Sequence, residues 1–392
     1  MQHETNTAIA RDIMLGFADR TGLTSTDNAP RRYLWTDAHA VCNFLSLYRN
    51  TSNERYRRLA LDLIDQVHHV LGKHRGDDAR HGWISGLSDE EGEKHPTAGG
   101  LRIGKTLNER RADEAYDERL EWDRDGQYFH YLTKWMHALY RASVVLEQPR
   151  FHRWAIELAK AAHAGFVRAP LPDGRKRLVW KMSIDLSYPL VPSSGLHDPL
   201  DGYITCNELA FSSPGTADLS ELPSLGTEIR ELHAMLEDQR WATDDPLGIG
   251  GLLFDACRSF QLIAAGHTGM LGIARTLTRD IQNSLPAFAG QFALGYPAGH
   301  RLAFRELGLS IGLHGVERMQ RIAAAELQLV EKSLRKALDQ LETHVALGMA
   351  IETFWSDPAN QRGATWSDHQ DINSVMLATS LLPDEFLSIF DG

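Results

Sequence analysis

Each long connection in this 392-residue chain ends in a polar, aromatic stretch at the start of a predicted helix. Six such helix starts, rich in aspartate, histidine, tryptophan and tyrosine, lie at residues 35–39, 123–130, 197–201, 241–245, 296–306 and 366–371. The connections at the opposite helix ends are mostly short. Short turns at one end and long loops at the other are typical of antiparallel helical hairpins. We therefore expect six inner helices whose N-termini meet at one mouth, and we look for chemistry there.

Hydrophobic residues recur at helical spacing almost throughout the chain. Residues 54–73 place Leu59, Leu63 and Val67 on one face, which is typical of an outer, half-exposed helix. Residues 36–49 are apolar on most faces, which is typical of a buried inner helix. Inner helices are predicted at 36–49, 127–146, 201–212, 250–265, 301–314 and 370–381. Outer helices are predicted at 5–20, 54–73, 150–168, 221–238, 269–285 and 316–345, and a piece of strand is expected within 178–184.

Six helical hairpins with one loop-rich end resemble the (α/α)6 toroid of six-hairpin glycosidases, lyases and sugar epimerases. The resemblance covers essentially the whole chain and is one of architecture and residue distribution. The Trp-x-Arg-Gly pattern of the unsaturated uronyl hydrolases is absent, so no residue is transferred position by position. The resemblance implies an all-α fold, a single toroid domain over residues 1–392 and a carbohydrate-type pocket.

Net charge and hydropathy argue against nucleic-acid and membrane partners, and the cysteine content indicates the compartment. The formal net charge of -11 argues against non-specific binding of nucleic acid and against anionic membranes. The chain has no apolar stretch of bilayer-spanning length and no apolar signal core near its start. Three sparse cysteines fit reduced thiols. We therefore expect a cytoplasmic protein with neither nucleic-acid nor membrane partners; the sequence carries no indication of oligomeric state.

Aspartates near the predicted inner helix starts are the leading catalytic candidates. Glycoside cleavage needs two carboxyl groups, a proton donor and a base or nucleophile. A helix N-terminus favours the ionised base, whereas burial or a neighbouring acid raises the pKa of the donor. We predict Asp37 or Asp368 as the base and Asp125 or Asp198 as the acid. The alternative for each is structural, because aspartate is also the usual cap of a helix N-terminus.

Aromatic, histidine and arginine side chains at the same helix starts are candidates for substrate binding. Aromatic rings stack on the apolar faces of sugars, histidine exchanges protons near neutral pH, and arginine holds carboxylates. Each type of residue also has a structural alternative. The tryptophans could anchor loops to the rim of the toroid, the histidines could lie on the surface, and the arginines could form structural salt bridges. The predicted substrate-binding residues are Trp35, His39, Tyr128, His130, Trp180, His197, Trp241, His300, Arg305, Trp366 and His369.

Polar residues also recur at helical spacing inside three predicted inner helices. They form the lines His39–Asn43–Ser46, His130–Lys134–His137–Arg141 and Thr205–Glu208–Ser212. A polar line on a buried helix usually faces a polar cavity, because unpaired buried polar groups are costly. The alternative is a solvated helix face.

Three functions remain open from the sequence. A glycoside hydrolase with two carboxylates is the leading one. A sugar epimerase or isomerase using His130 and His369 is the second, and a non-catalytic saccharide-binding or interaction protein is the third. Cys42, Cys206 and Cys257 lie at similar depths in predicted inner helices, but buried, inert cysteine is the usual state. We therefore expect no metal and no cofactor, and a saccharide or another small polar substrate.

Overall fold

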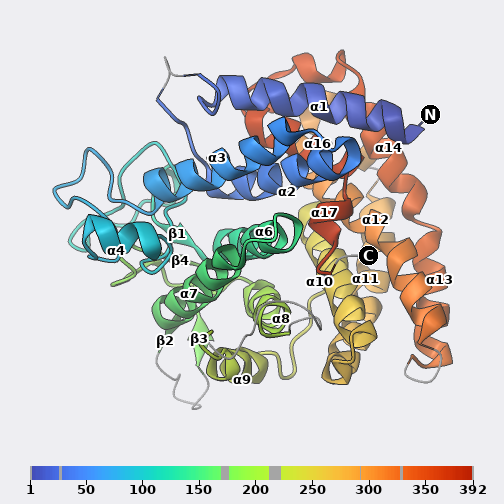
Figure 1. Ribbon diagram of the computed structural model, residues 1–392. Helices are drawn as coiled ribbons and strands as arrows, with labels where there is room; N and C mark the ends of the chain where they lie inside the picture. The colour runs from blue at the N-terminus through green and yellow to red at the C-terminus, as the bar shows by residue number, and fades with distance from the viewer. Residues whose placement is uncertain are drawn as a thin grey trace. The chain divides into compact units, whose positions relative to one another are not determined.

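The computed structural model describes residues 2–25, 29–168, 176–211, 222–291, 293–326 and 330–390. Helices dominate these ranges (Figure 1). The α-helices are α1 (Gln2–Arg20), α2 (Leu34–Thr51), α3 (Glu54–Leu71), α4 (Asp89–Lys94), α5 (Glu118–Glu121), α6 (Phe129–Val145), α7 (Pro149–Phe166), α8 (Asp198–Ala210), α9 (Gly226–Ala234), α10 (Pro246–Ala264), α11 (Leu271–Gly290), α12 (Ala303–Ala325), α13 (Lys332–Glu342), α14 (Val345–Ser356), α15 (Ala364–Ser367), α16 (Gln370–Leu381) and α17 (Asp384–Leu387). Short 3-10 turns lie at Thr268–Met270, Ala293–Gly295, Ala298–His300 and Asn360–Arg362.

The chain forms two compact units. Unit 1 comprises Met1–Phe17, Arg49–Ser52 and Arg240–Gly392, and unit 2 comprises Ala18–Tyr48 and Asn53–Gln239. The single-domain organisation expected from the sequence stays a prediction, and each unit is described by itself.

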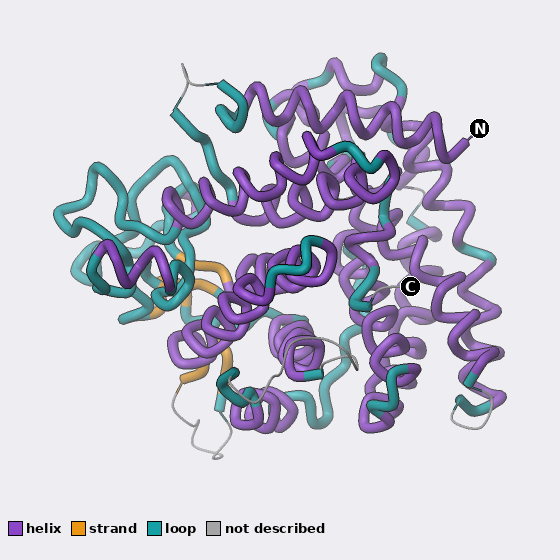
Figure 2. The backbone as a smooth tube through the Cα atoms, in the orientation of Figure 1, coloured by secondary structure: helices purple, strands orange, loops and turns teal. Residues whose placement is uncertain are grey.

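In unit 2, helix α6 packs against α7 and α8, and α8 also packs against α9. Short strands lie among the described loops of this unit, and Figure 2 shows them in orange. They are β1 (Gln127–Tyr128), β2 (Val167–Arg168), β3 (Arg177–Leu178), β4 (Lys181–Met182) and β5 (Pro189–Val191). They pair antiparallel in the orders β1-β4-β5 and β2-β3. Because β1 leads directly into α6 and pairs with β4, this small sheet fixes where α6 begins.

In unit 1, helix α10 packs against α11 and α12, and α12 packs against α13, α14 and α16. Glycines allow α10 and α12 to approach closely, since a Cβ on Gly250 would lie 2.1 Å from the carbonyl oxygen of Gly308. Among the described residues, α10 is the one helix long and apolar enough to cross a membrane. However, 78% of that segment is buried inside the protein, as expected for a core helix.

Local sequence signals explain several helix starts. The side chains of Asn53, Ser88 and Asp245 accept a backbone N–H in the first turns of α3, α4 and α10, which satisfies donors that the helix itself leaves unpaired. Proline lies in the first turns of α7, α8 and α10, where its missing N–H costs nothing.

The all-α prediction is confirmed, and the predicted inner and outer helices overlap the observed ones with one exception. The chain was expected to turn near Gly315, but α12 continues to Ala325. Gly315 serves close packing there, because a Cβ on it would lie 3.2 Å from Cβ of Cys257. The predicted outer helix 316–345 is therefore wrong as one helix: its second half is α13, and α14 occupies residues expected to be a loop.

Candidate functional site

Two aspartates three residues apart begin α8 and form the centre of the candidate site. Asp198 is the first residue of α8, and Asp201 lies in the same first turn and on the same face. Helix α6 supplies two donors to Asp201: the Thr133 hydroxyl donates to Oδ2 over 2.5 Å, and Lys134 Nζ donates to the same oxygen over 2.8 Å. An opposite charge this close favours the ionised form of a carboxyl group.

Asp198 lies in the opposite electrostatic environment. Its side chain is buried, and its Oδ2 has no hydrogen-bond partner among the described residues. Burial, followed by the neighbouring Asp201 charge, raises the pKa of Asp198 to about 7, against the smaller opposing effect of Lys134. The start of a helix favours a carboxylate by only about 0.3–1 kcal/mol at an exposed position. Burial therefore dominates, and Asp198 keeps its proton up to neutral pH.

The chain packs closely over the Asp198 carboxyl group. A Cβ on Gly195 would lie 2.5 Å from Cγ and from Oδ2 of Asp198. Glycine at position 195 therefore allows the backbone of this loop to pack directly against the Asp198 carboxyl group. This contact explains how an acid at a helix start becomes buried.

His130, near the start of α6, faces Asp198. Its Nδ1 lies 3.8 Å from Oδ1 of Asp198, and the imidazole side chain is about one-third exposed. Burial and then the Lys134 charge lower the pKa of His130 to about 4. The imidazole is therefore neutral at pH 7, and the two side chains approach each other without forming a charged pair.

Aromatic side chains surround His130. Tyr128 stacks on it at 5.5 Å between ring centroids, Tyr131 lies edge-on at 4.8 Å, and Trp35 lies at 6.0 Å. The Trp35 Nε1 and the Tyr128 hydroxyl are buried and have no hydrogen-bond partner among the described residues. Buried polar atoms normally find partners. Together with Oδ2 of Asp198, three such atoms from three segments border His130.

The aromatic cluster extends from His130 towards the surface. The Trp180 ring lies 5.1 Å from that of Tyr128, and the Trp122 ring lies 5.8 Å from that of Trp180. Trp180 is oriented by a hydrogen bond from its Nε1 to the Ser193 hydroxyl, 2.7 Å away, and Trp122 is 56% exposed. These rings form a stepped apolar track that starts at the surface and ends at His130.

Apart from the partly exposed His130, the described residues of the polar lines expected along the inner helices are buried rather than solvated. His137 and Glu208 are completely buried and hydrogen-bonded over 2.6 Å. His39 is also buried, and burial, with smaller effects from Lys134 and His137, lowers its pKa to about 3. These groups form a polar layer in unit 2. Ser212, the last residue of the third line, lies outside the described residues.

Asp37 and Asp125 are engaged by other parts of the chain. Asp37 accepts the Tyr33 backbone N–H over 2.8 Å and pairs with Arg32 at 3.4 Å. Asp125 accepts hydrogen bonds from the Arg102 guanidinium over 2.5 Å and from the Gly104 N–H over 3.0 Å. Both carboxylates are buried in these contacts, which serve the loop structure. Their catalytic role stays a prediction, and nothing in the geometry favours it.

The remaining candidates divide between the units. His197 is half-buried and immediately precedes Asp198 in unit 2. The other six lie in unit 1. There, Trp241 and Trp366 are buried, Asp368, His369 and His300 are exposed, and Arg305 pairs with Asp245 at 2.7 Å. The structure thus brings Trp35, Tyr128, His130, Trp180 and Asp198 together, and their functional roles stay predictions.

Several residues of the cluster were not among the predicted site residues: Asp201, Thr133, Lys134, Tyr131 and Trp122. The spacing of Asp198 and Asp201 on one helical face was the available signal for Asp201. Among the described residues, no group of three or more His, Cys, Asp or Glu side chains is arranged to hold a metal ion, and the three cysteines are buried free thiols.

No family model and no curated protein matches the chain. Two similar solved structures come from one enzyme, the alpha-1,6-mannanase GH76A from Salegentibacter sp. HEL1_6. The first is 12% identical, with a TM-score of 0.53 over 98% of this chain and 100% of that chain. The second is an inactive variant with two aspartates replaced by alanine, in complex with alpha-1,6-mannotetrose. It is 10% identical, with a TM-score of 0.51 over 98% and 99% of the chains. The fold is thus the (α/α)6 toroid that the resemblance implied.

Proposed function

We propose that this protein is a glycoside hydrolase in which Asp198 is the proton donor and Asp201 is the ionised partner carboxylate. The observation that carries the proposal is the unequal electrostatic environment of these two aspartates on one turn of α8. A raised pKa near 7 suits the donor, and an ion pair to Lys134 suits the ionised partner. The fold shared with a glycosidase supports the same reaction class.

The proposed reaction needs only these side chains and water. Asp198 donates its proton to the glycosidic oxygen as the bond to the anomeric carbon breaks. Asp201 stabilises the positive charge that develops on the sugar. Water then adds its hydroxyl group to the anomeric carbon, and its remaining proton restores the acid form of Asp198. General acid assistance of this kind contributes about 10²- to 10⁴-fold in rate.

The aromatic track supplies the binding surface in this proposal. The rings of Trp122, Trp180 and Tyr128 offer apolar faces to successive sugar rings. Among the described residues, the Tyr128 hydroxyl and the Trp35 Nε1 find no hydrogen-bond partner, and sugar hydroxyl groups are suitable partners. We accordingly propose a saccharide of more than one residue as the substrate.

The epimerase alternative has less support. A base that removes a proton from a sugar works best with a pKa near the working pH, and burial holds the pKa of His130 at about 4. Its proposed partner, His369, is exposed and lies in unit 1. The environment of Asp198 and Asp201 supports hydrolysis over mere saccharide binding, since binding does not require one protonated and one ionised carboxyl group.

The first test substrate is alpha-1,6-mannotetraose, because the similar structure was solved with that ligand. A panel of other alpha- and beta-linked oligosaccharides completes the test, with reducing ends as the readout. We expect turnover that disappears in Asp198→Asn and Asp201→Asn. The exposed Asp113, replaced as Asp113→Asn, is the matched control and should keep full activity. Binding without turnover on the whole panel would contradict the proposal and favour a saccharide-binding protein.

A further inference from the structure

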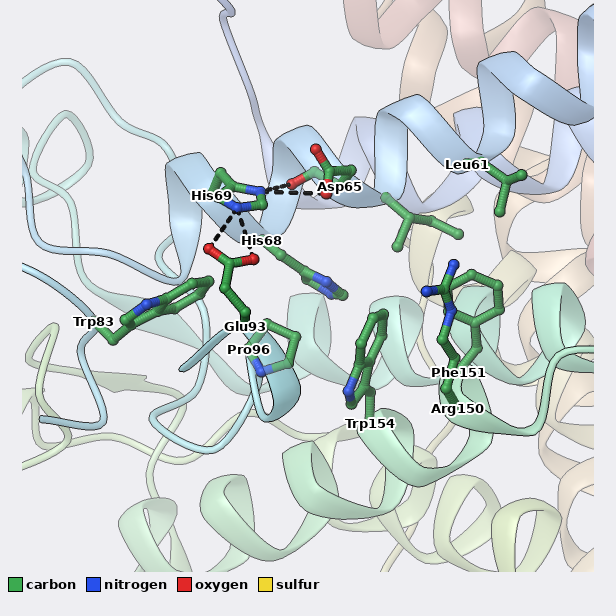
Figure 3. Close-up of a pocket in the computed structure, with 11 residues that line it drawn as sticks. Leu61, Asp65, His68, His69, Trp83, Glu93, Pro96, Arg150, Phe151 and Trp154 are labelled. Atoms are coloured by element: carbon green, nitrogen blue, oxygen red, sulfur yellow. Dashed lines mark hydrogen bonds and ion pairs between the residues drawn. The ribbon is translucent and has the colours of Figure 1, made fainter. Parts of the chain in front are cut away.

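Unit 2 also contains a pocket whose lining includes none of the residues of the proposed hydrolase site. It is formed between α3, α4 and α7, and its lining includes His68, His69, Glu93, Arg150 and Trp154 (Figure 3). Its volume of about 60 Å³ is small and has room for a few water molecules, since one water needs roughly 10–15 Å³ of such space. Only a small chemical group can occupy its interior.

His68 lines this pocket, and its ring is held by a hydrogen bond to the neighbouring helix α6. Its side chain is buried, and its Nε2 accepts a hydrogen bond from the Trp135 Nε1 over 3.2 Å. Burial lowers the pKa of His68 to about 3, so the ring is neutral. Because Nε2 acts as the acceptor, the single ring proton must lie on Nδ1. This Nδ1 has no hydrogen-bond partner among the described residues.

Arg150 supplies a positive charge next to this donor. Its guanidinium carbon lies 4.9 Å from the ring centroid of Phe151 and 5.5 Å from that of Trp154. The His68 ring stands edge-on to Trp154 at 5.1 Å. Figure 3 shows His68 and Arg150 on either side of Trp154. Within the described ranges, Arg150 makes no ion pair, so its charge is not compensated by the protein.

The acids of the pocket are already paired. Both oxygens of Glu93 bond to His69 Nε2, at 2.9 and 3.0 Å, and Asp65 lies 3.4 Å from His69 Nδ1. Burial opposes the charged form, but the hydrogen bonds to Asp65 and Glu93 raise the pKa of His69. Lys73 is a further cation at 4.0 Å from Glu93. The positive charge of Arg150 therefore remains available to a ligand.

We propose that this pocket binds an organic carboxylate. Its two oxygens would lie between the Nδ1–H of His68 and the guanidinium of Arg150, and its apolar body would cover the ring of Trp154. An arginine and a neutral donor match the acceptor-only chemistry of a carboxylate, and the pocket has room for a carboxylate group. The site shares none of these side chains with the Asp198–Asp201 site and does not depend on the proposed hydrolase activity.

The test is a titration with sodium butyrate, followed by tryptophan fluorescence at constant ionic strength. Butyramide, which has nearly the same shape but no charge, is the matched ligand control. We expect saturable butyrate binding, at least tenfold weaker binding of butyramide, and at least a tenfold loss of butyrate affinity in Arg150→Gln. Arg153→Gln, on the same helix but outside the pocket lining, removes the same charge and should leave the affinity unchanged.

Nitrogen-15 NMR of the His68 ring provides a second readout. Butyrate should shift the protonated Nδ1 resonance and leave Nε2, which is occupied by Trp135, largely unchanged. Equal affinity for butyrate and butyramide, equal loss in Arg150→Gln and Arg153→Gln, or a response that does not saturate would overturn the proposal.

Discussion

The ammonium group of Lys134 lies 2.8 Å from Oδ2 of Asp201, and this contact distinguishes two aspartates that share one turn of α8. Asp201 gains a cation and a hydroxyl donor from α6. Asp198 gains neither, and its Oδ2 is buried against the backbone of Gly195. In the proposed reaction, one of these carboxyl groups must be protonated while the other is ionised, and the contacts of α6 with α8 produce that difference.

The pH dependence of activity should follow the protonation of Asp198. The donor is active only with its proton, and burial places its pKa at about 7. We therefore expect kcat/KM to fall about tenfold per pH unit above pH 7. Rates measured between pH 5 and 9 test this prediction. A rate that stays constant between pH 7 and 9 would contradict it.

Lys134 is expected to act as a positioning residue through Asp201. Replacement as Lys134→Met removes the partner cation, so kcat should fall by about 10- to 100-fold. Lys134 also lowers the pKa of Asp198, so its loss should move the alkaline limb of the pH profile to higher pH. Lys134→Arg, which keeps the charge, should return the alkaline limb to the pH at which it lies in the unmodified protein. A reduced rate with an unchanged limb in Lys134→Met would indicate a purely structural role.

Gly195 provides a way to move the acid without changing it. In Gly195→Ala, the new Cβ would lie 2.5 Å from the Asp198 carboxyl group, so the side chain must shift. A displacement of about 1 Å can cost up to about 100-fold in rate, and we expect kcat to fall at least tenfold. Gly251→Ala, whose Cβ meets no atom within 4 Å, is the control. Unchanged kcat in Gly195→Ala would show that the position of Asp198 is unimportant.

Asp37 should matter for stability and not for turnover. Its carboxylate accepts the Tyr33 N–H and pairs with the buried Arg32. Asp37→Asn weakens both contacts and should reduce the free energy of unfolding by about 1–3 kcal/mol, while kcat stays within about twofold. Urea denaturation and a rate assay on the same sample check this. Lost turnover at unchanged stability would restore Asp37 as a catalytic candidate.

Helical periodicity was sufficient to predict most of the fold. The one-sided pattern of α3 and the apolar pattern of α2 have local causes that a sequence shows directly. The continuation of α12 through Gly315 does not, because it depends on the close approach of Cys257 on α10. The same glycine would also suit a turn, so the sequence alone favoured the wrong hairpin.

Only part of the candidate site was predicted, because only some of its residues carry a local sequence signal. Asp198, His130, Tyr128, Trp35 and Trp180 were found because each lies at or near a helix start or in a long loop. Asp37, Asp125 and Asp198 share that local signal, but Arg32 and Arg102 engage the first two. The selection of Asp201 depends on Lys134, which is 67 residues away in the chain. An ion pair between residues this far apart in the chain depends on helix packing and cannot be recognised in the local sequence.

The central claim is that Asp198 donates the proton and Asp201 does not. It is tested most directly by comparing kcat on an alkyl glycoside and on a 2,4-dinitrophenyl glycoside of the same sugar. The dinitrophenolate leaves without protonation, so Asp198→Asn should lose at least 100-fold on the first substrate and less than tenfold on the second. Asp201→Asn should lose activity on both. Equal losses on both substrates in Asp198→Asn would contradict its assignment as the acid.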